Sequence, residues 1–490
     1  MNKIFSLDTS LRLISLFFVS IFILLFFFYL FNAGSLNDYS SINTLLLLWI
    51  IGYQFIYLLI LSFDKNFIYL LFTPFIWYKI ASLVFYGFGP LAYYFGNDFT
   101  VAHMHNYYFA SNETIHKIIN IYLLIILSID LLIIIYNSIF DLNFKKQLSK
   151  VNMKLFLYYV LALGIFFKYF LAVPFTLAGI GYPALINQFT RFILIGLFIS
   201  YSLGLENKFY KIMFYIILTV EILSSFFLLT KEPLVLTVIF GTFVILYHNF
   251  KFKQLIINLI LLISLYSFIQ PLFSVLRSTD SNKFGITSVA ELSQAYNTLQ
   301  SFYSSNNVSQ SIIKNYQGWW TRVSYVNYQA FALEAYNRGD YGDTFKNFKY
   351  ILIPRFLYPE KPNMNSGTKY HSLISNNFNE RSPNNTGPGI FFEAYWNGGF
   401  LYLFIIIFYF STLVFFLSKI IIQNLIQKNF LILMLSVNAI YIGRGIDGWF
   451  NARYGTYIIY IICIFLVSIL IYNSLQYLVL NLKDNKLEKL

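Results

Sequence analysis

A proline-rich stretch from Ile353 to Pro362, IPRFLYPEKP, contains the side chains best suited to holding an anion. Its three prolines prevent a regular helix and favour a rigid turn, because proline lacks an amide hydrogen and restricts the residue before it. That turn holds Arg355 and Lys361. Arginine offers a planar fork to a phosphate group and lysine a point charge, so the pair suits an anionic, phosphate-like ligand. The alternative is an ordinary surface turn whose charges are solvated.

Three further cations, Lys79, Lys168 and Arg191, lie inside apolar runs. A charge within a bilayer is costly unless it faces a cavity or a partner, so each of these residues is a functional candidate. Lys79 lies deep in its run, where Asp130 or Glu221 could neutralise it, and we expect a structural role there. Arg191 lies near the outer end of its run, and both it and Lys168 are candidates for binding an anion.

Metal ligands are sparse in this sequence. His103 and His105 form an HMH triplet, and Asp340 and Asp343 lie in a glycine-rich turn, but neither pair has an evident third ligand. Because Cys463 is the one cysteine, the sequence excludes an internal disulfide and a cysteine-based zinc site. It also contains no glycine-rich phosphate loop, which argues against ATP. We therefore expect a protein that uses no metal and no other cofactor.

These charged residues are embedded in a chain of 490 residues, of which 58% are apolar and 11% are charged, values outside the range of water-soluble domains. A helix needs about 20 apolar residues to span a bilayer. Twelve such runs are expected, at residues 11–31, 42–62, 68–95, 116–139, 155–174, 186–205, 209–229, 233–248, 254–275, 389–417, 429–446 and 454–478. The sequence thus predicts an all-α, polytopic integral membrane protein with about 12 transmembrane helices.

Lysines in alternate loops predict the orientation, because basic residues near span ends stay on the cytoplasmic side. Every second loop carries them: Lys65, Lys145, Lys146, Lys150, Lys154, Lys208, Lys211, Lys251, Lys253, Lys419 and Lys428. The loops at 32–41 and 174–187 carry no Lys or Arg. Both termini are therefore expected in the cytoplasm. The formal net charge of +13 is spread over the loops rather than gathered on one face, so no nucleic-acid partner is expected.

The pattern of spans is interrupted once, and this predicts the domain organisation. Residues 1–276 are expected to form transmembrane helices 1 to 9, residues 277–388 a large extracytoplasmic, substrate-binding loop, and residues 389–490 helices 10 to 12. Within the loop, the stretch GWWTRVSYVNYQAFALEAY places apolar residues at helical spacing. Its paired tryptophans, Trp319 and Trp320, favour a position at the membrane surface. The loop is therefore expected to contain short helices.

The end of this loop is similar to a known pattern. IPRFLYPEKP is followed, after a gap that contains a glycine, by TGPGIFFEAYWNGGFLYL, which ends at Leu403. Together they resemble the Wzy-type polymerases of oligosaccharide (O-antigen) repeat units, where an Arg-Pro-Lys-Pro turn precedes a Gly-Glu-Tyr-Asn-Phe-Gly-like entry into a helix. The ten residues between Arg444 and Gly455 resemble a spacing described for some of these polymerases. Phe392 departs from the pattern, because a small residue usually precedes the glutamate.

The resemblance implies a membrane glycosyltransferase of the bacterial inner (cytoplasmic) membrane that acts at its outer face. Its substrate would be an undecaprenyl pyrophosphate-linked oligosaccharide. The growing glycan would leave its undecaprenyl pyrophosphate and be transferred to a sugar hydroxyl of the next lipid-linked repeat. The lipid bilayer, a chain-length regulator and a flippase are the further partners of such an enzyme.

For this reaction, the expected catalytic residues are Arg355, Arg444 and Glu393. The arginines would stabilise the departing pyrophosphate, and Glu393, at the outer start of a helix, would accept the proton of the acceptor hydroxyl. Asp447 is an alternative base, as is His371. The expected substrate-binding residues are Lys361, Arg322, Arg453, Arg191, Lys168 and His371. The alternative for each cation is a structural salt bridge, and for Glu393 it is charge complementarity with the helix N-terminus or with Arg355.

Two other functions are considered beside polymerisation. A polysaccharide ligase would move finished polymer onto a different acceptor, and the sequence does not separate it from a polymerase. A lipid-linked glycan flippase or solute transporter would use intramembrane Lys and Arg to line a path. The long outer loop argues against transport, as does the lack of the paired interrupted helices that many transporters show.

Overall fold

The computed structural model describes residues 4–32, 38–105, 108–140, 152–178, 183–228, 230–249, 318–350, 366–375, 387–450 and 456–487, with single positions such as Tyr454. Every regular element in these ranges is a helix. Ten of the helices are long and apolar enough to cross a membrane. The prediction of an all-α, multi-pass membrane protein is thereby confirmed.

The ten helical spans correspond to ten of the predicted apolar runs. They cover Leu7–Phe31, Tyr39–Ser62, Pro74–Phe95, Asn112–Ile139, Met153–Leu177, Leu185–Gly204, Lys208–Phe227, Ile390–Ile426, Phe430–Asp447 and Ile458–Tyr477. The predicted run at 233–248 forms the shorter apolar helix α13 (Lys231–His248). The predicted run at 254–275 lies outside the described ranges, apart from single positions.

The chain divides into two compact units, each built from segments distant in the sequence. Unit 1 contains Met1–Phe144, Asn315–Gln423 and Ala439–Ile459, and unit 2 contains Lys145–Lys314, Asn424–Asn438 and Tyr460–Leu490. Helices α20 (Ile390–Ile426), α21 (Leu433–Arg444) and α22 (Thr456–Leu487) each contribute residues to both units.

Unit 1 is a helical bundle with short helices at one end. Its first elements are α1 (Leu7–Asn32), α2 (Tyr39–Ser62), α3 (Phe67–Leu70), α4 (Pro74–Ser82), the π-helix η1 (Leu83–Phe88), α5 (Ala92–Phe95), α6 (Asp98–His105) and α7 (Asn112–Ile139). Between α7 and α20 come α17 (Gly318–Thr321), α18 (Val326–Asn337), the 3₁₀-helix η3 (Thr344–Tyr350) and α19 (Ser366–Ser375), and after α21 comes the 3₁₀-helix η5 (Gly445–Asp447).

Burial within unit 1 follows the packing of its helices. Helix α2 packs against α1, α7 and η1, and α18 packs against α7. The side chains of Ile50, Ile126 and Phe410 are fully buried. By contrast, α1 exposes large apolar side chains such as Phe22 and Tyr29, which are 75% and 68% accessible. Exposed apolar faces of this kind suit contact with lipid rather than with water.

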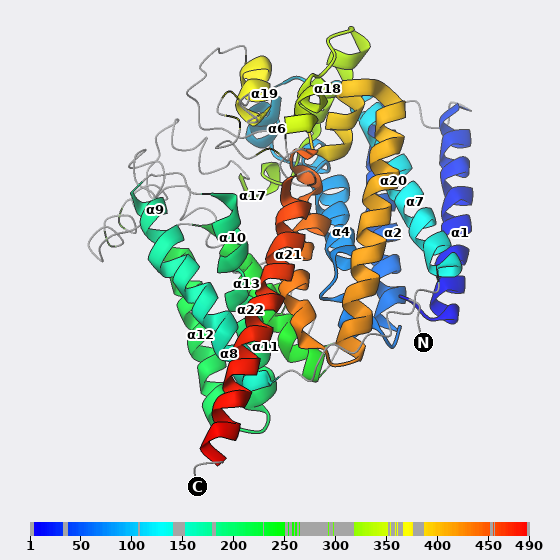
Figure 1. The fold of residues 1–490 in the computed structure, drawn as a ribbon. Helices are drawn as coiled ribbons and strands as arrows, with labels where there is room; N and C mark the ends of the chain where they lie inside the picture. Colours follow the sequence, from blue (N-terminus) through cyan, green and yellow to red (C-terminus); the bar gives the residue numbers. More distant parts are fainter. Residues whose placement is uncertain are drawn as a thin grey trace. The chain divides into compact units, whose positions relative to one another are not determined.

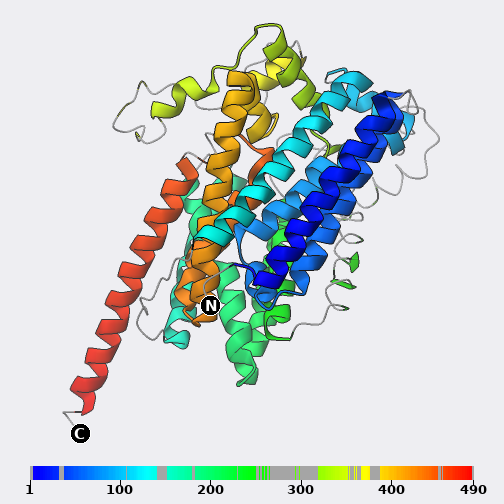
Figure 2. The same ribbon diagram turned by 90° about the vertical axis from the view of Figure 1, so that its right-hand side faces the viewer.

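The N-terminal residues and the short helices lie at opposite ends of unit 1. The amide of Ile4 donates to Asn137 Oδ1, at the last turn of α7, over 2.8 Å. At the first turn of α7, Thr114 Oγ1 donates to Glu334 Oε1 of α18 over 2.8 Å. Figures 1 and 2 both show α18 and α19 at the end of unit 1 where α20 begins. That the N-terminus is cytoplasmic and the loop extracytoplasmic stays a prediction.

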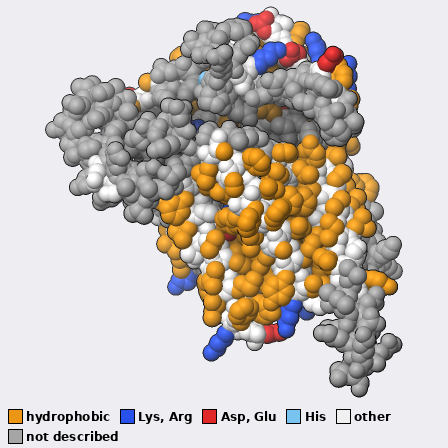
Figure 3. All heavy atoms as spheres, turned by 60° about the vertical axis from the view of Figure 1, so that its left-hand side comes forward, with side chains coloured by type: hydrophobic (Ala, Val, Ile, Leu, Met, Phe, Trp, Pro, Cys, Tyr) orange, Lys and Arg blue, Asp and Glu red, His pale blue; other side chains and the backbone are white. Residues whose placement is uncertain are grey.

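Unit 2 is a second helical bundle. It contains α8 (Met153–Ile165), the π-helix η2 (Phe166–Ala172), α9 (Val173–Leu177), α10 (Ala184–Thr190), α11 (Phe192–Gly204), α12 (Lys208–Phe227), α13 and the 3₁₀-helix η4 (Phe430–Ile432). Helix α11 is central, because it packs against α8, α12 and α13. Helix α12 exposes apolar residues such as Phe209 and Ile216. In the part of the face that Figure 3 colours, hydrophobic side chains gather over the middle, and most of the Lys, Arg, Asp and Glu side chains lie toward the upper and lower margins.

The close approach of α21 to α4 in unit 1 requires a glycine. A Cβ atom at Gly443 would lie 1.8 Å from the backbone oxygen of Pro74. We predict that Gly443→Ala lowers the free energy of unfolding by about 1 to 3 kcal/mol, the usual cost of overpacking. Gly52→Ala is the matched control, because a Cβ there would meet nothing within 4 Å. Thermal unfolding of the purified variants measures both effects, and equal midpoints would refute the close contact.

Candidate functional site

Helix α20 begins with a short segment that is separated from the rest by a glycine break. The backbone at Gly398 and Gly399 is non-helical, and Gly399 has φ 61° and ψ −148°, a conformation that favours glycine. The segment before the break, from Ile390 to Asn397, contains the predicted catalytic Glu393. The span from Phe400 to Ile426 is long enough to cross a bilayer without it, since a crossing takes about 20 residues.

A glycine turn fastens the start of this segment to the residues that follow α21. Gly389 has φ +83°, and a Cβ atom there would lie 2.8 Å from the backbone oxygen of Ile446. A Cβ atom at Gly387 would lie 2.7 Å from Nε1 of Trp449. Residues 387–389 therefore pack directly on the turn at 445–450, because neither glycine carries a side chain that would hold the two backbone segments apart.

The other end of the segment is held by an amide side chain. Nδ2 of Asn397 donates to Oγ1 of Thr344 over 2.9 Å and to the backbone oxygen of Glu393 over 2.8 Å. Oδ1 of Asn397 accepts from the amide of Phe345 over 3.4 Å. Asn397 thereby connects η3, from the region between the spans, to the last turn before the glycine break.

Glu393 is fully buried in this arrangement, with no accessible surface. Its Oε2 accepts a hydrogen bond from the backbone amide of Phe450 over 2.6 Å. Its Oε1 is buried and has no hydrogen bond within 3.5 Å among the described residues, although the Thr344 side chain lies close enough to interact with the carboxyl group as a hydrogen-bond donor. The carboxyl group thus bridges the start of α20 and the turn at 445–450.

The turn that Glu393 contacts carries two further predicted site residues, Arg444 and Asp447. Arg444 ends α21, is half-buried, and places Cζ of its guanidinium 5.2 Å from the ring centroid of Tyr441. Asp447 ends η5, is also half-buried, and its Oδ2 accepts a hydrogen bond from the Tyr325 hydroxyl over 3.2 Å. Arg444 and Asp447 are thus presented on one short connection beside Glu393.

An aromatic cluster covers the same turn. The ring of Tyr370, on α19, lies 5.2 Å from that of Trp396 and 5.3 Å from that of Trp449. Burial raises the pKa of the Tyr370 phenol well above its ordinary value. The phenol therefore stays protonated and donates to the backbone oxygen of Tyr328 over 2.5 Å. Helices α18 and α19 are tied together above the turn through this contact.

Of the remaining predicted site residues, Arg322 and His371 also lie in unit 1. Arg322 is exposed and precedes Tyr325 by three residues, and His371 is half-buried beside Tyr370 on α19. Unit 1 thus brings together segments that carry Glu393, Arg444, Arg322 and His371. Three predicted residues, Arg355, Lys361 and Arg453, lie outside the described residues.

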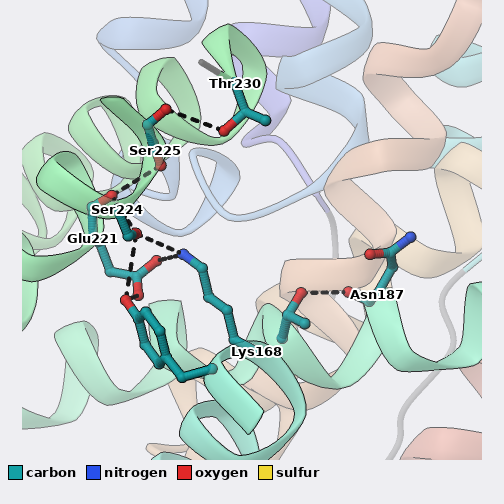
Figure 4. Close-up of polar contacts among 8 residues, drawn as sticks. Lys168, Asn187, Glu221, Ser224, Ser225 and Thr230 are labelled. Carbon is teal, nitrogen blue, oxygen red and sulfur yellow. Dashed lines mark hydrogen bonds and ion pairs between the residues drawn. The ribbon is translucent and has the colours of Figure 1, made fainter. Parts of the chain in front are cut away.

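The two other predicted substrate-binding residues lie in unit 2. Nζ of Lys168, on η2, lies 2.5 Å from Oε2 of Glu221 and donates to Ser224 over 3.3 Å, as Figure 4 shows. Arg191, between α10 and α11, donates to Gln188 over 2.7 Å and to Asn438 over 3.1 Å. Both residues therefore have protein partners, and their part in binding a substrate stays a prediction.

Lys79 is paired with Asp130, one of the two partners that the sequence offered. Its Nζ lies 2.5 Å from Oδ2 of Asp130, and both side chains are fully buried in unit 1. The same Nζ donates to Gln54 over 3.1 Å and lies 3.5 Å from the ring centroid of Tyr57. The other candidate, Glu221, belongs to Lys168 instead.

Sequence reasoning missed several residues that shape this region: Gln54, Tyr325, Tyr370, Asn397 and the amide of Phe450. Asn397 could have been noticed, because it is a polar residue directly before two glycines in an apolar run. The others carry no such signal. Their partners are 25 or more positions away along the chain.

Comparisons with known proteins add no assignment to this region. No family model, no curated protein and no solved structure matches the chain. Among the described residues, no group of three or more His, Cys, Asp or Glu side chains could hold a metal ion.

Proposed function

We propose that this protein is a membrane glycosyltransferase that polymerises undecaprenyl pyrophosphate-linked oligosaccharide repeats. The observation that carries the proposal is the packing of the segment Gly387–Asn397, which resembles the polymerases, on the turn that bears Arg444 and Asp447. This places an arginine and a carboxylate together beside the short helices of unit 1. A departing pyrophosphate needs cations, and an acceptor hydroxyl needs a base, so one small region provides both types of group.

The rest of unit 1 is suited to such a substrate. A polyprenyl tail needs an apolar surface, and α1 and α20 expose residues such as Phe22 and Leu401. An oligosaccharide needs polar and aromatic side chains outside the bilayer, and α18 and its neighbours provide residues such as Asp340 and Tyr341. In this proposal, Arg355 and Lys361 join Arg444 at the pyrophosphate, in the inner membrane of a bacterium with the site at the outer face.

The proposal is tested with purified protein in detergent micelles. Lipid-linked single repeats are extracted from a strain that lacks this gene, and we expect the protein to convert them into a ladder of polymers. Micelles have no compartments, so a flippase or transporter produces no new compound there. A single transfer to an added second acceptor, without a ladder, would identify a ligase, and unchanged single repeats with well-folded protein would refute a polymerase.

A further inference from the structure

The position of Glu393 is poorly suited to direct contact with a substrate. Its side chain has no accessible surface, and Oε2 is already engaged by the amide of Phe450 at 2.6 Å. A general base must come within hydrogen-bond distance of the hydroxyl whose proton it accepts. For Glu393 to do this, the packing around its side chain would have to open. Glu393 is better placed to hold that turn than to touch a sugar.

Asp447 occupies the accessible side of the same turn. Its side chain is half-buried, while its neighbours Gly445 and Ile446 are buried. The carboxylate accepts a hydrogen bond from the Tyr325 hydroxyl, and Tyr86 of η1 lies near enough to interact with it electrostatically. Among the described residues this phenol is the one hydrogen-bond donor to the Asp447 carboxylate, which has about four lone-pair positions when ionised. Within that part of the chain, Asp447 is oriented and can accept further hydrogen bonds.

Three contacts fix the position of this carboxylate. Glu393 binds the amide of Phe450 on one side of the turn, the glycines of residues 387–389 lie against Ile446 and Trp449, and Tyr325 holds the carboxylate itself. A catalytic group needs such support, because a small displacement of a reacting group has a large effect on the rate. Arg444, three residues earlier, places a cation on the same connection.

We propose that Asp447 is the general base of the transfer reaction and that Glu393 is a positioning residue that holds the turn carrying it. This assignment rests on the proposed function. The acceptor hydroxyl gives its proton to the Asp447 carboxylate as its oxygen bonds to the anomeric carbon of the donor glycan. The bond between that carbon and the pyrophosphate oxygen breaks, and its electron pair leaves with the undecaprenyl pyrophosphate. The proton then passes from Asp447 to water.

The test compares matched variants in the polymerisation assay in micelles. Asp447→Asn keeps the size of the side chain but removes the base, so we expect kcat to fall by about 10²- to 10⁴-fold with little change in KM. Glu393→Gln keeps an oxygen that can accept from the Phe450 amide, so it should retain nearly normal kcat. Glu393→Ala loses that oxygen and should lose both activity and thermal stability. Rescue by Gln but not by Ala is the signature of a positioning role.

A chemical rescue distinguishes a missing base from a damaged fold. Asp447→Ala leaves a space into which formate, a small carboxylate, can enter, and added formate should restore part of the lost rate. Formate should have no effect on Glu393→Ala. A structural role for Asp447 predicts no rescue, and that result would overturn the assignment.

The outcomes separate this assignment from the proposed function. If the wild-type protein polymerises and Asp447→Asn is equally active, Asp447 is not the base and the polymerase proposal stands. If Glu393→Gln is inactive although folded, Glu393 acts directly and the two roles are reversed. If the folded wild-type protein forms no ladder, the proposed function is refuted and the assignment with it.

Discussion

Lys79→Met is expected to lower the free energy of unfolding by about 3 to 5 kcal/mol, because it leaves Asp130 as an uncompensated buried charge. Both side chains have no accessible surface, and Nζ of Lys79 lies 2.6 Å and 2.5 Å from the two carboxylate oxygens. The Tyr53 hydroxyl donates to the same carboxylate over 2.9 Å, a weaker replacement for a cation. Among the described residues, removing the lysine therefore leaves the Asp130 carboxylate with this one neutral donor.

The double variant Lys79→Met/Asp130→Leu provides the control. Apolar residues of similar volume often replace a buried ion pair at no cost in stability, so the double variant should recover most of the loss. The stability of each variant is measured by thermal unfolding in detergent. The yield of monodisperse protein is a second measure. If the double variant is stable and still forms polymer, the pair is structural. A stable double variant without activity would instead place Lys79 and Asp130 in the function.

The spans were predictable from sequence because hydropathy reports the free energy of transfer into lipid, which is a local property. Ten runs of the sequence are helices in the structure for that reason. The partners of the buried lysines were not predictable to the same degree. The sequence offered Lys79 either Asp130 or Glu221, and only the fold shows that Asp130 belongs to Lys79 and Glu221 to Lys168.

The candidate site illustrates the same limit. The sequence identified Glu393, Arg444 and Asp447 from their residue types and from their positions near the ends of spans. It did not indicate that Glu393 is fully buried, because burial depends on segments that are distant along the chain, such as the residue 57 positions later whose amide binds the carboxyl group. The break at Gly398 and Gly399 was hidden as well, since both glycines lie within one continuous apolar run.

Arg355→Ala is expected to abolish long polymer by raising the barrier to transfer by about 2.7 to 4 kcal/mol, or roughly 10²- to 10³-fold in rate. The hydrogen bonds from Arg355 should strengthen as the leaving pyrophosphate gains charge. Their loss therefore raises the free energy of the transition state more than that of the bound substrate. Arg355→Lys should restore little, because lysine does not reproduce the two parallel hydrogen bonds of a guanidinium group. Polymer length is measured in cells that express equal amounts of each variant, where single lipid-linked repeats should accumulate.

Arg338→Ala is the matched control for this prediction. Arg338 is an arginine of unit 1 whose side chain is 52% accessible and whose ion pair with Asp340 is exposed. An exposed pair contributes at most about 1 kcal/mol, so this variant should form normal polymer. Comparing Arg355→Ala with Arg338→Ala tests whether polymer formation needs Arg355 itself or only the positive charge of the region. If Arg355→Ala at normal abundance forms normal polymer, the charges of the proline-rich turn are merely solvated. The proposed pyrophosphate site would then consist of Arg444 without Arg355.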